Sequence, residues 1–192
     1  ADFVDAETKR ALDTLREAER PARGATSRER AAHELRLLSA TLVLRELARS
    51  APTALYAHVG ETLRLLWPPL CAPGAPLRAA AAGALRACLE LSAQRQAPAR
   101  PQWVSVLLDG ARDALGREGA PAAWHGALLA LLALLPHAAP GTQLHAAFDV
   151  ACDGVRRQLL LRKSTDLLLA ALALLPALAA ALPAEFAAER LP

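Results

Sequence analysis

An apolar segment recurs four times along this 192-residue chain, and its spacing limits what the chain can fold into. The copies start 40 to 43 residues apart: TLVLREL at 41–47, GALRACL at 83–89, GALLALL at 126–132 and DLLLAAL at 166–172. Each lies in a pattern with helical period, and a proline-bearing break and a second helical pattern adjoin it. The chain is therefore expected to consist of helical pairs arranged in series.

The stretch 75–96 shows the pattern most plainly. Its apolar residues recur at steps of three and four, which places them on one side of a helix: Leu77, Ala81, Ala84, Leu85, Cys88 and Leu89. Arg78, Arg86 and Glu90 fall on the other side, and Arg86 and Glu90 are close enough to pair. Pro76 suits a first helical turn, where its missing N–H costs nothing.

The same criteria predict a helix for almost every part of the chain. Aromatic residues make up only 4 % of the sequence, whereas alanine and leucine, both strong helix formers, are abundant. We expect a linker at 68–76, N-caps at Thr142 and Ser164, and an interruption at Pro176. The predicted helices cover 2–17, 28–50, 52–66, 75–96, 101–117, 122–135, 142–161, 165–182 and 184–190.

A period of about 40 to 47 residues with two helices per unit is typical of HEAT and armadillo arrays. The predicted fold class is all-α, an α-solenoid of about four helix pairs, because helices that are apolar on several sides must cover one another. We expect one segment over 1–192, with a helix at 2–17 and units at 26–71, 75–118, 121–162 and 164–192. Apolar faces at both ends predict self-association of the chain in isolation.

No motif in the sequence supports catalysis or cofactor binding, so we assign no catalytic, cofactor-binding or metal-binding residue, and the partner-binding residues stay unknown. His125 lies near a helix start without a nucleophile placed beside it by any motif. Asp149 and Asp153 share a helical face, but the adjacent Arg156 and Arg157 favour surface pairing over a cation site. The three tryptophans are isolated at helix ends and are interpreted as packing anchors: Trp67, Trp103 and Trp124.

Charge and hydropathy argue against two other classes of protein. The net charge is +3, but no basic face is interleaved with aromatic residues, so nucleic-acid binding is not expected. The apolar run 167–182 has sixteen residues, fewer than the roughly 20 that span a bilayer, so no transmembrane segment is predicted. Three scattered cysteines, with Cys88 and Cys152 on apolar stripes, favour a reducing, cytoplasmic setting.

Several longer strings carry a family resemblance. FVDAETKRALDTL at 3–15, VLRELARSAPT at 43–53, GALRACLELSAQRQ at 83–96, RPQW at 100–103, WHGALLAL at 124–131, FDVACDGVRRQLL at 148–160 and LALLPALAAALPAEF at 172–186 are the strings concerned. In this order they resemble the N-terminal HEAT-repeat region of the target of rapamycin (TOR) serine/threonine protein kinases. The stretch 18–40 departs from the family by being longer and more charged, and 137–145 by lacking a long insertion.

The resemblance implies a scaffold segment of a kinase that controls growth in response to nutrients. The family's kinase domain, with its ATP and magnesium, lies far toward the C-terminus, so no cofactor is implied for this segment. Implied partners are companion subunits, neighbouring HEAT repeats and a dimer mate. The alternatives are an unrelated HEAT or armadillo adaptor, a membrane protein, and a small helical enzyme that uses His125 or the Asp149/Asp153 pair.

Overall fold

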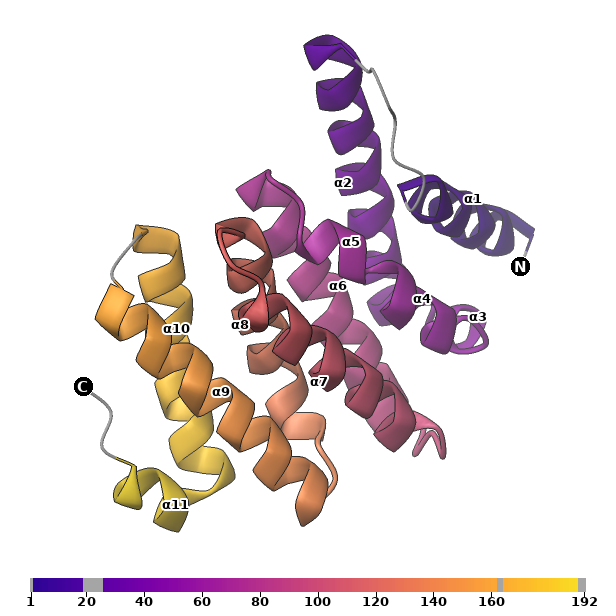
Figure 1. The fold of residues 1–192 in the computed structure, drawn as a ribbon. Coiled ribbons are helices and arrows are strands. Elements are labelled where there is room, and N and C mark those ends of the chain that lie inside the picture. The colour runs from indigo at the N-terminus through magenta and orange to yellow at the C-terminus, as the bar shows by residue number, and fades with distance from the viewer. Residues whose placement is uncertain (1, 19–25, 162–163, 190–192) are drawn as a thin grey trace. The chain divides into compact units, whose positions relative to one another are not determined.

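The computed structural model describes residues 2–18, 26–161 and 164–189, which form helices and no strand. The predicted all-α, solenoid-like fold class is confirmed, since the described residues are helical and the helices pack on one another within each of two parts of the chain (Figure 1). Contacts divide the chain into two compact units, Ala1–Ala97 and Pro98–Pro192. The elements are α1 Asp2–Ala18, α2 Ser27–Ser50, α3 Pro52–Tyr56, α4 Val59–Leu65, α5 Trp67–Leu70, α6 Ala75–Gln94, α7 Arg100–Gly116, α8 Pro121–Leu134, the 3-10 turn η1 Leu135–His137, α9 Thr142–Leu161, α10 Thr165–Ala181 and α11 Pro183–Ala188.

The first unit is built around α2 and α6. These two helices run in the same direction and pack along each other, α1 packs on α2, and the short helices α3 to α5 lie across them (Figure 1). The predicted stripe of α6 is buried throughout, which confirms its inward orientation. Leucines dominate this core, as expected for helices whose stability comes mainly from apolar burial: Leu12, Leu15, Leu44, Leu55, Leu63, Leu70, Leu85 and Leu89.

The second unit repeats this arrangement with α7 to α11. Helices α8 and α10 run in the same direction and pack on each other, while α7 packs on α8 and α9 packs on α10 (Figure 1). Trp124 and Leu128 of α8 and Leu174 of α10 are among the buried residues of this core. None of the helices in the described ranges is long and apolar enough to cross a membrane.

Four polar contacts between helices within the units have sequence separations close to the spacing of the repeated apolar segments. Each joins residues about one repeat apart, with separations of 42 to 45 positions: Arg16 with Glu61, Arg95 with Thr53, Gln143 with Pro101 and Arg157 with Leu115. Since each contact lies inside one unit, the period describes how helices stack within both units. Side chains that contact residues about one repeat away thus help to fix how the helices align within each unit.

The region 52–76 differs from the prediction. The expected single helix at 52–66 is broken into α3 and α4 by a turn at Ala57 and His58, where φ of His58 is −108° and ψ is 2°. The expected linker at 68–76 begins with the helical turn α5, in which Pro69 and Leu70 are buried. Proline fits a first helical turn, so consecutive prolines start a short helix here instead of excluding one.

Three single-residue predictions are also corrected. Arg78 does not face outward: it is 6 % exposed, and its Nη1 donates to the carbonyls of Ala72 and Pro73 that precede α6. Pro176 does not interrupt its helix, because α10 continues through it on an exposed face where the lost backbone bond can be replaced by water. Thr142 is the first helical residue of α9 and not its cap. Ser164 does hold the N-cap position of α10, although its side chain makes no capping hydrogen bond.

Candidate functional site

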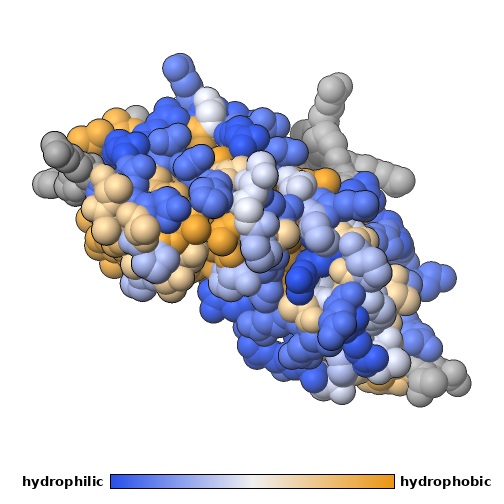
Figure 2. Space-filling view, turned by 90° about the horizontal axis from the view of Figure 1, so that it is seen from below, coloured by the Kyte–Doolittle hydropathy of each residue, from blue (hydrophilic) through white to orange (hydrophobic). Residues whose placement is uncertain are grey.

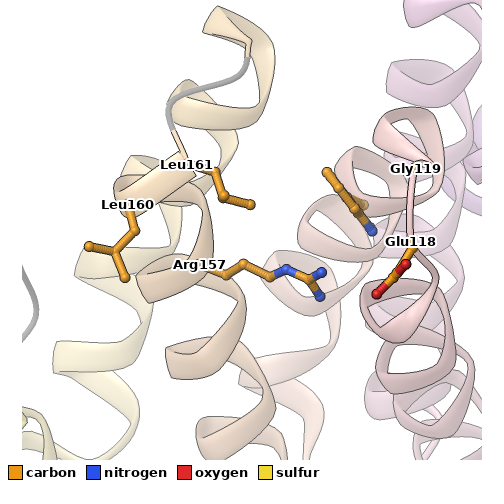
Figure 3. A pocket seen from close by; sticks show the side chains of 6 residues that line it. Glu118, Gly119, Arg157, Leu160 and Leu161 are labelled. Atoms are coloured by element: carbon orange, nitrogen blue, oxygen red, sulfur yellow. The ribbon is translucent and has the colours of Figure 1, made fainter.

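A surface pocket of about 440 Å³ lies in the second unit, between the α7–α8 turn and the C-terminal end of α9 (Figure 3). The turn reverses at Gly119, whose φ of +68° is a left-handed conformation that glycine adopts without steric cost. The lining residues are Glu118, Gly119, Trp124, Arg157, Leu160 and Leu161.

Trp124 and Arg157, two of the residues that line this pocket, contact each other. The indole is 2 % exposed, and its Nε1 donates to the carbonyl of Arg117 at 2.7 Å. The guanidinium carbon of Arg157 lies 5.1 Å from the indole ring centroid, within the range of a cation–π interaction. Arg157 Nη1 also donates to the carbonyl of Leu115 at 2.5 Å. These contacts tie α9 to both α7 and α8.

The rim of the pocket combines apolar and charged groups. Leu160 is 66 % exposed and Leu161 is 41 % exposed, and the carboxylate of Glu118 lies across the pocket from Arg157 (Figure 3). The lining contains no hydroxyl, thiol or imidazole. It offers binding groups for another side chain, without the paired nucleophile and base that covalent catalysis requires.

The residues considered as catalytic candidates are not assembled into a site. His125 is half-buried on α8. Asp149 and Asp153 are exposed on α9, and Asp153 pairs with Arg156 at 3.2 Å, which agrees with the interpretation as surface pairing. Within residues 2–18, 26–161 and 164–189, no group of three or more histidine, cysteine or acidic residues could hold a metal ion.

Cys88 and Cys152 are buried, as their places on apolar stripes predict. Burial raises the pKa of the Cys88 thiol to about 12 and is also the main cause that raises the pKa of Cys152 to about 11. The thiolate is the reactive form of cysteine, so both groups stay protonated and inert near neutral pH. They act as small core residues.

Two features of α9 could not be found from the sequence. Ion pairs link it to the segment around α11: His145 Nε2 lies 3.5 Å from Glu185, and Arg156 Nη2 donates to Glu189 at 2.5 Å. The hydrogen bond to the Gly141 carbonyl, followed by the Glu185 interaction, raises the pKa of His145. Gln158 is 1 % exposed, and neither atom of its amide has a hydrogen-bond partner in the structure.

The surface as a whole mixes polar and apolar residues. On the face drawn in Figure 2, hydrophilic residues predominate and apolar patches lie among them. The strongly exposed large apolar side chains include Leu35 on α2, Val106 on α7 and Leu169 on α10. The described residues thus form an all-α protein of packed helices with a mixed polar and apolar surface.

Comparison with curated proteins shows similarity to TOR kinases over part of the chain. The serine/threonine-protein kinase TOR of Arabidopsis thaliana is 37 % identical over 102 residues, or 53 % of this chain. The kinase tor1 of Schizosaccharomyces pombe is 29 % identical over 153 residues, or 80 % of the chain, and mTor of Drosophila melanogaster is 31 % identical over 121 residues, or 62 %.

These matches support a TOR-related segment. The chain spans only 4 to 6 % of the length of the curated relatives it matches. No family model matches the sequence, and no solved structure matches it either.

Proposed function

We propose that this chain is a non-catalytic HEAT-repeat scaffold segment of a TOR-type serine/threonine protein kinase and acts by binding other proteins. The observation that carries the proposal is the similarity to three TOR kinases in a chain whose layers are tied at intervals of 42 to 45 residues. That interval is the HEAT and armadillo period. An unrelated helical-repeat adaptor would share the period without the similarity.

We infer four repeat units from the sequence, at 26–71, 75–118, 121–162 and 164–192. By residue range, the first would contain α2 to α5, the second α6 and α7, the third α8 and α9, and the fourth α10 and α11. Each unit would supply one apolar helix for stacking and one amphipathic helix for the surface.

The proposed partners are proteins: companion subunits such as the regulatory-associated protein of the first TOR complex, neighbouring HEAT repeats, and a dimer mate. ATP and magnesium would be bound by a kinase domain elsewhere in the parent polypeptide, and this segment would need no cofactor. The proposed location is the cytoplasm. Nutrient and growth signalling would be the process that the parent kinase serves.

The test uses the full polypeptide that the gene encodes and a deletion of residues 26–189 from it. We expect the full polypeptide to phosphorylate a generic serine/threonine substrate and to co-purify with the companion subunit. The deletion should lose the companion subunit while kinase activity on the generic peptide persists. A gene product without kinase activity, or undiminished subunit binding after the deletion, would refute the proposal.

A further inference from the structure

A second surface pocket adjoins the one at Trp124, and the two pockets share Arg157. The second pocket has a volume of about 270 Å³ and is lined by residues of α7 and α9, among them Arg112, Leu115 and Asp153. Arg157 also lines the pocket of about 440 Å³ described above. We call the two pockets together the α9 groove, and Arg157 lies at its middle.

The α9 groove follows a single stripe of its helix. The α9 residues that line it lie 3, 4, 7, 10 and 11 positions after Val150, which is helical spacing: Asp153, Gly154, Arg157, Leu160 and Leu161. At about 1.5 Å per residue, this stripe is about 16 Å long. An extended chain advances about 3.3 Å per residue, so about five residues would cover the groove.

The guanidinium of Arg157 is held in place in the groove before any partner binds. Nη1 donates to the carbonyl of Leu115, and the planar group lies over the indole of Trp124. A guanidinium carries several N–H donors, and those that do not contact Leu115 can bind both oxygens of a carboxylate. Because the side chain is already positioned, binding a carboxylate would require little further ordering of it.

The groove is apolar on the C-terminal side of Arg157. Leu160 is 66 % exposed and Leu161 is 41 % exposed, although both are large apolar residues. Packing an apolar side chain against them would remove this surface from water. An apolar patch beside a positioned arginine is typical of the residues that dominate protein–protein binding.

Glu118 limits the charge that the groove accepts. Its carboxylate lies across the pocket from Arg157 (Figure 3). One acidic group of a partner can bind Arg157, but a second acidic group in the same pocket would be repelled by Glu118. The groove therefore suits a segment with a single carboxylate better than an acidic run.

We propose that the α9 groove binds an extended segment of a partner protein, about five residues long, with one carboxylate on Arg157 and an adjacent large apolar side chain on Leu160 and Leu161. This proposal rests on the proposed function, because it assigns a site and a chemistry to one of the protein partners of the chain. A basic segment would be repelled by Arg157, and a wholly apolar one would bury its charge without a counter-ion. The charge at the middle of the groove thus selects a carboxylate.

The first test selects peptides from a random seven-residue library displayed on phage, with the full polypeptide that the gene encodes as the target. The variant L160E/L161E is the second target. V106E is the control, because Val106 of α7 is 62 % exposed and does not line the groove. We expect the parent and V106E, and not L160E/L161E, to enrich peptides with one Asp or Glu beside a large apolar residue. No such enrichment, or enrichment that L160E/L161E retains, would overturn the proposal.

The second test measures the affinity of the most enriched peptide by fluorescence anisotropy. Replacing its acidic residue with the corresponding amide should weaken binding about tenfold, because a charge-assisted hydrogen bond is lost. Glu118→Gln should strengthen binding about threefold, because it removes a like charge from the pocket. A gain in affinity cannot result from misfolding. An unchanged affinity in either comparison would contradict the assignment of Arg157 and Glu118.

The outcomes for this site and for the proposed function are measured separately. Kinase activity and co-purification of the companion subunit, measured on the parent polypeptide, report on the proposed function. If both persist while no peptide is selected, the proposed function stands and the assignment of the α9 groove is wrong. If peptides are selected by a polypeptide without kinase activity, the groove binds its segment in a protein of another class.

Discussion

The contact between Arg157 and α7 gives the sharpest test of how the layers are held together. Replacing Arg157 with alanine removes a hydrogen bond to the Leu115 carbonyl and a cation–π interaction with Trp124. A hydrogen bond from a charged donor contributes about 1.5–3 kcal/mol, and a partly exposed cation–π pair adds about 0.5–1 kcal/mol. Because the side chain is half-buried and water can replace part of both interactions, we expect the free energy of unfolding to fall by about 2 kcal/mol.

The matched control is Arg112→Ala. Arg112 lies on the neighbouring helix α7 and pairs with Asp109 at 3.2 Å, with side-chain exposures of 55 % and 69 %. Exposed pairs of this kind contribute about 0.3–0.5 kcal/mol. The variant Arg157→Lys keeps the charge but loses the planar group that stacks on the indole, so its loss should be intermediate, about 1 kcal/mol.

Urea unfolding followed by far-ultraviolet circular dichroism measures these differences. A change of about 2 kcal/mol in a unit of this size also lowers the melting temperature by about 8–16 °C. If Arg157→Ala and Arg112→Ala change the free energy of unfolding equally, then the contact one repeat back contributes nothing beyond an ordinary surface pair. That result would refute the view that such contacts stabilise the stack.

Four further substitutions test other parts of the structure. Gly83→Ala should stabilise the protein by up to about 1 kcal/mol, since only a flexible arginine side chain must move. Gly154→Ala should destabilise the protein, because a new Cβ would lie 3.1 Å from a buried leucine methyl. Urea unfolding of the two variants measures both differences in the free energy of unfolding. Because the pKa of His145 is raised in the folded state, its contribution to stability is present below its ordinary pKa and is lost as pH rises through the folded-state pKa. Glu185→Gln should reduce this pH dependence of the melting temperature. An unchanged pH profile would show that Glu185 does not contribute to it. Gln158→Leu should stabilise the protein by about 1–2 kcal/mol by removing a buried unpaired amide, and a lower melting temperature would show that the amide has a partner.

Much of the helical organisation follows from local signals. The helix predicted to follow Thr142 ends at 161, as α9 does, and α9 begins at Thr142 itself, one residue earlier than an N-cap there implies; proline and glycine before it and a clear apolar stripe within it give the approximate ends and the orientation. Pro76 lies in the first turn of α6 as predicted. Helix 2–17 ends one residue later than expected, at Ala18. These features depend on neighbours in sequence, so the sequence alone contains them.

Most of the incorrect predictions concern residues whose environment is set by tertiary structure, which local sequence patterns do not reveal. Arg78 has the charge of a surface residue, yet its guanidinium is used inside the first unit to satisfy two carbonyls. Pro176 has the signal of a helix breaker, but α10 continues through it at an exposed position, where water can bind the carbonyl that lost its partner. Arg157 is expected to pair on the surface with the aspartates of its own helix, and nothing local reveals the carbonyl 42 positions earlier. Tertiary packing decides these cases.

The contacts one repeat apart also explain how an alanine- and leucine-rich stack acquires a fixed register. Gln143 near the start of α9 donates to Pro101 near the start of α7, and Arg157 near the end of α9 donates to Leu115 near the end of α7. Both contacts have a separation of 42 residues. Equal separations at the two ends require the helices to run in parallel without slipping, because a one-residue shift would break both bonds.

Apolar contact alone would not impose this register. Burial energy depends mainly on the apolar area removed from water and has no directional preference, so it defines the register of two helices less strictly than a hydrogen bond does. The polar contacts are directional and lose most of their energy when displaced. The register of the layers within the second unit thus depends on a small set of directional side-chain contacts in addition to apolar burial.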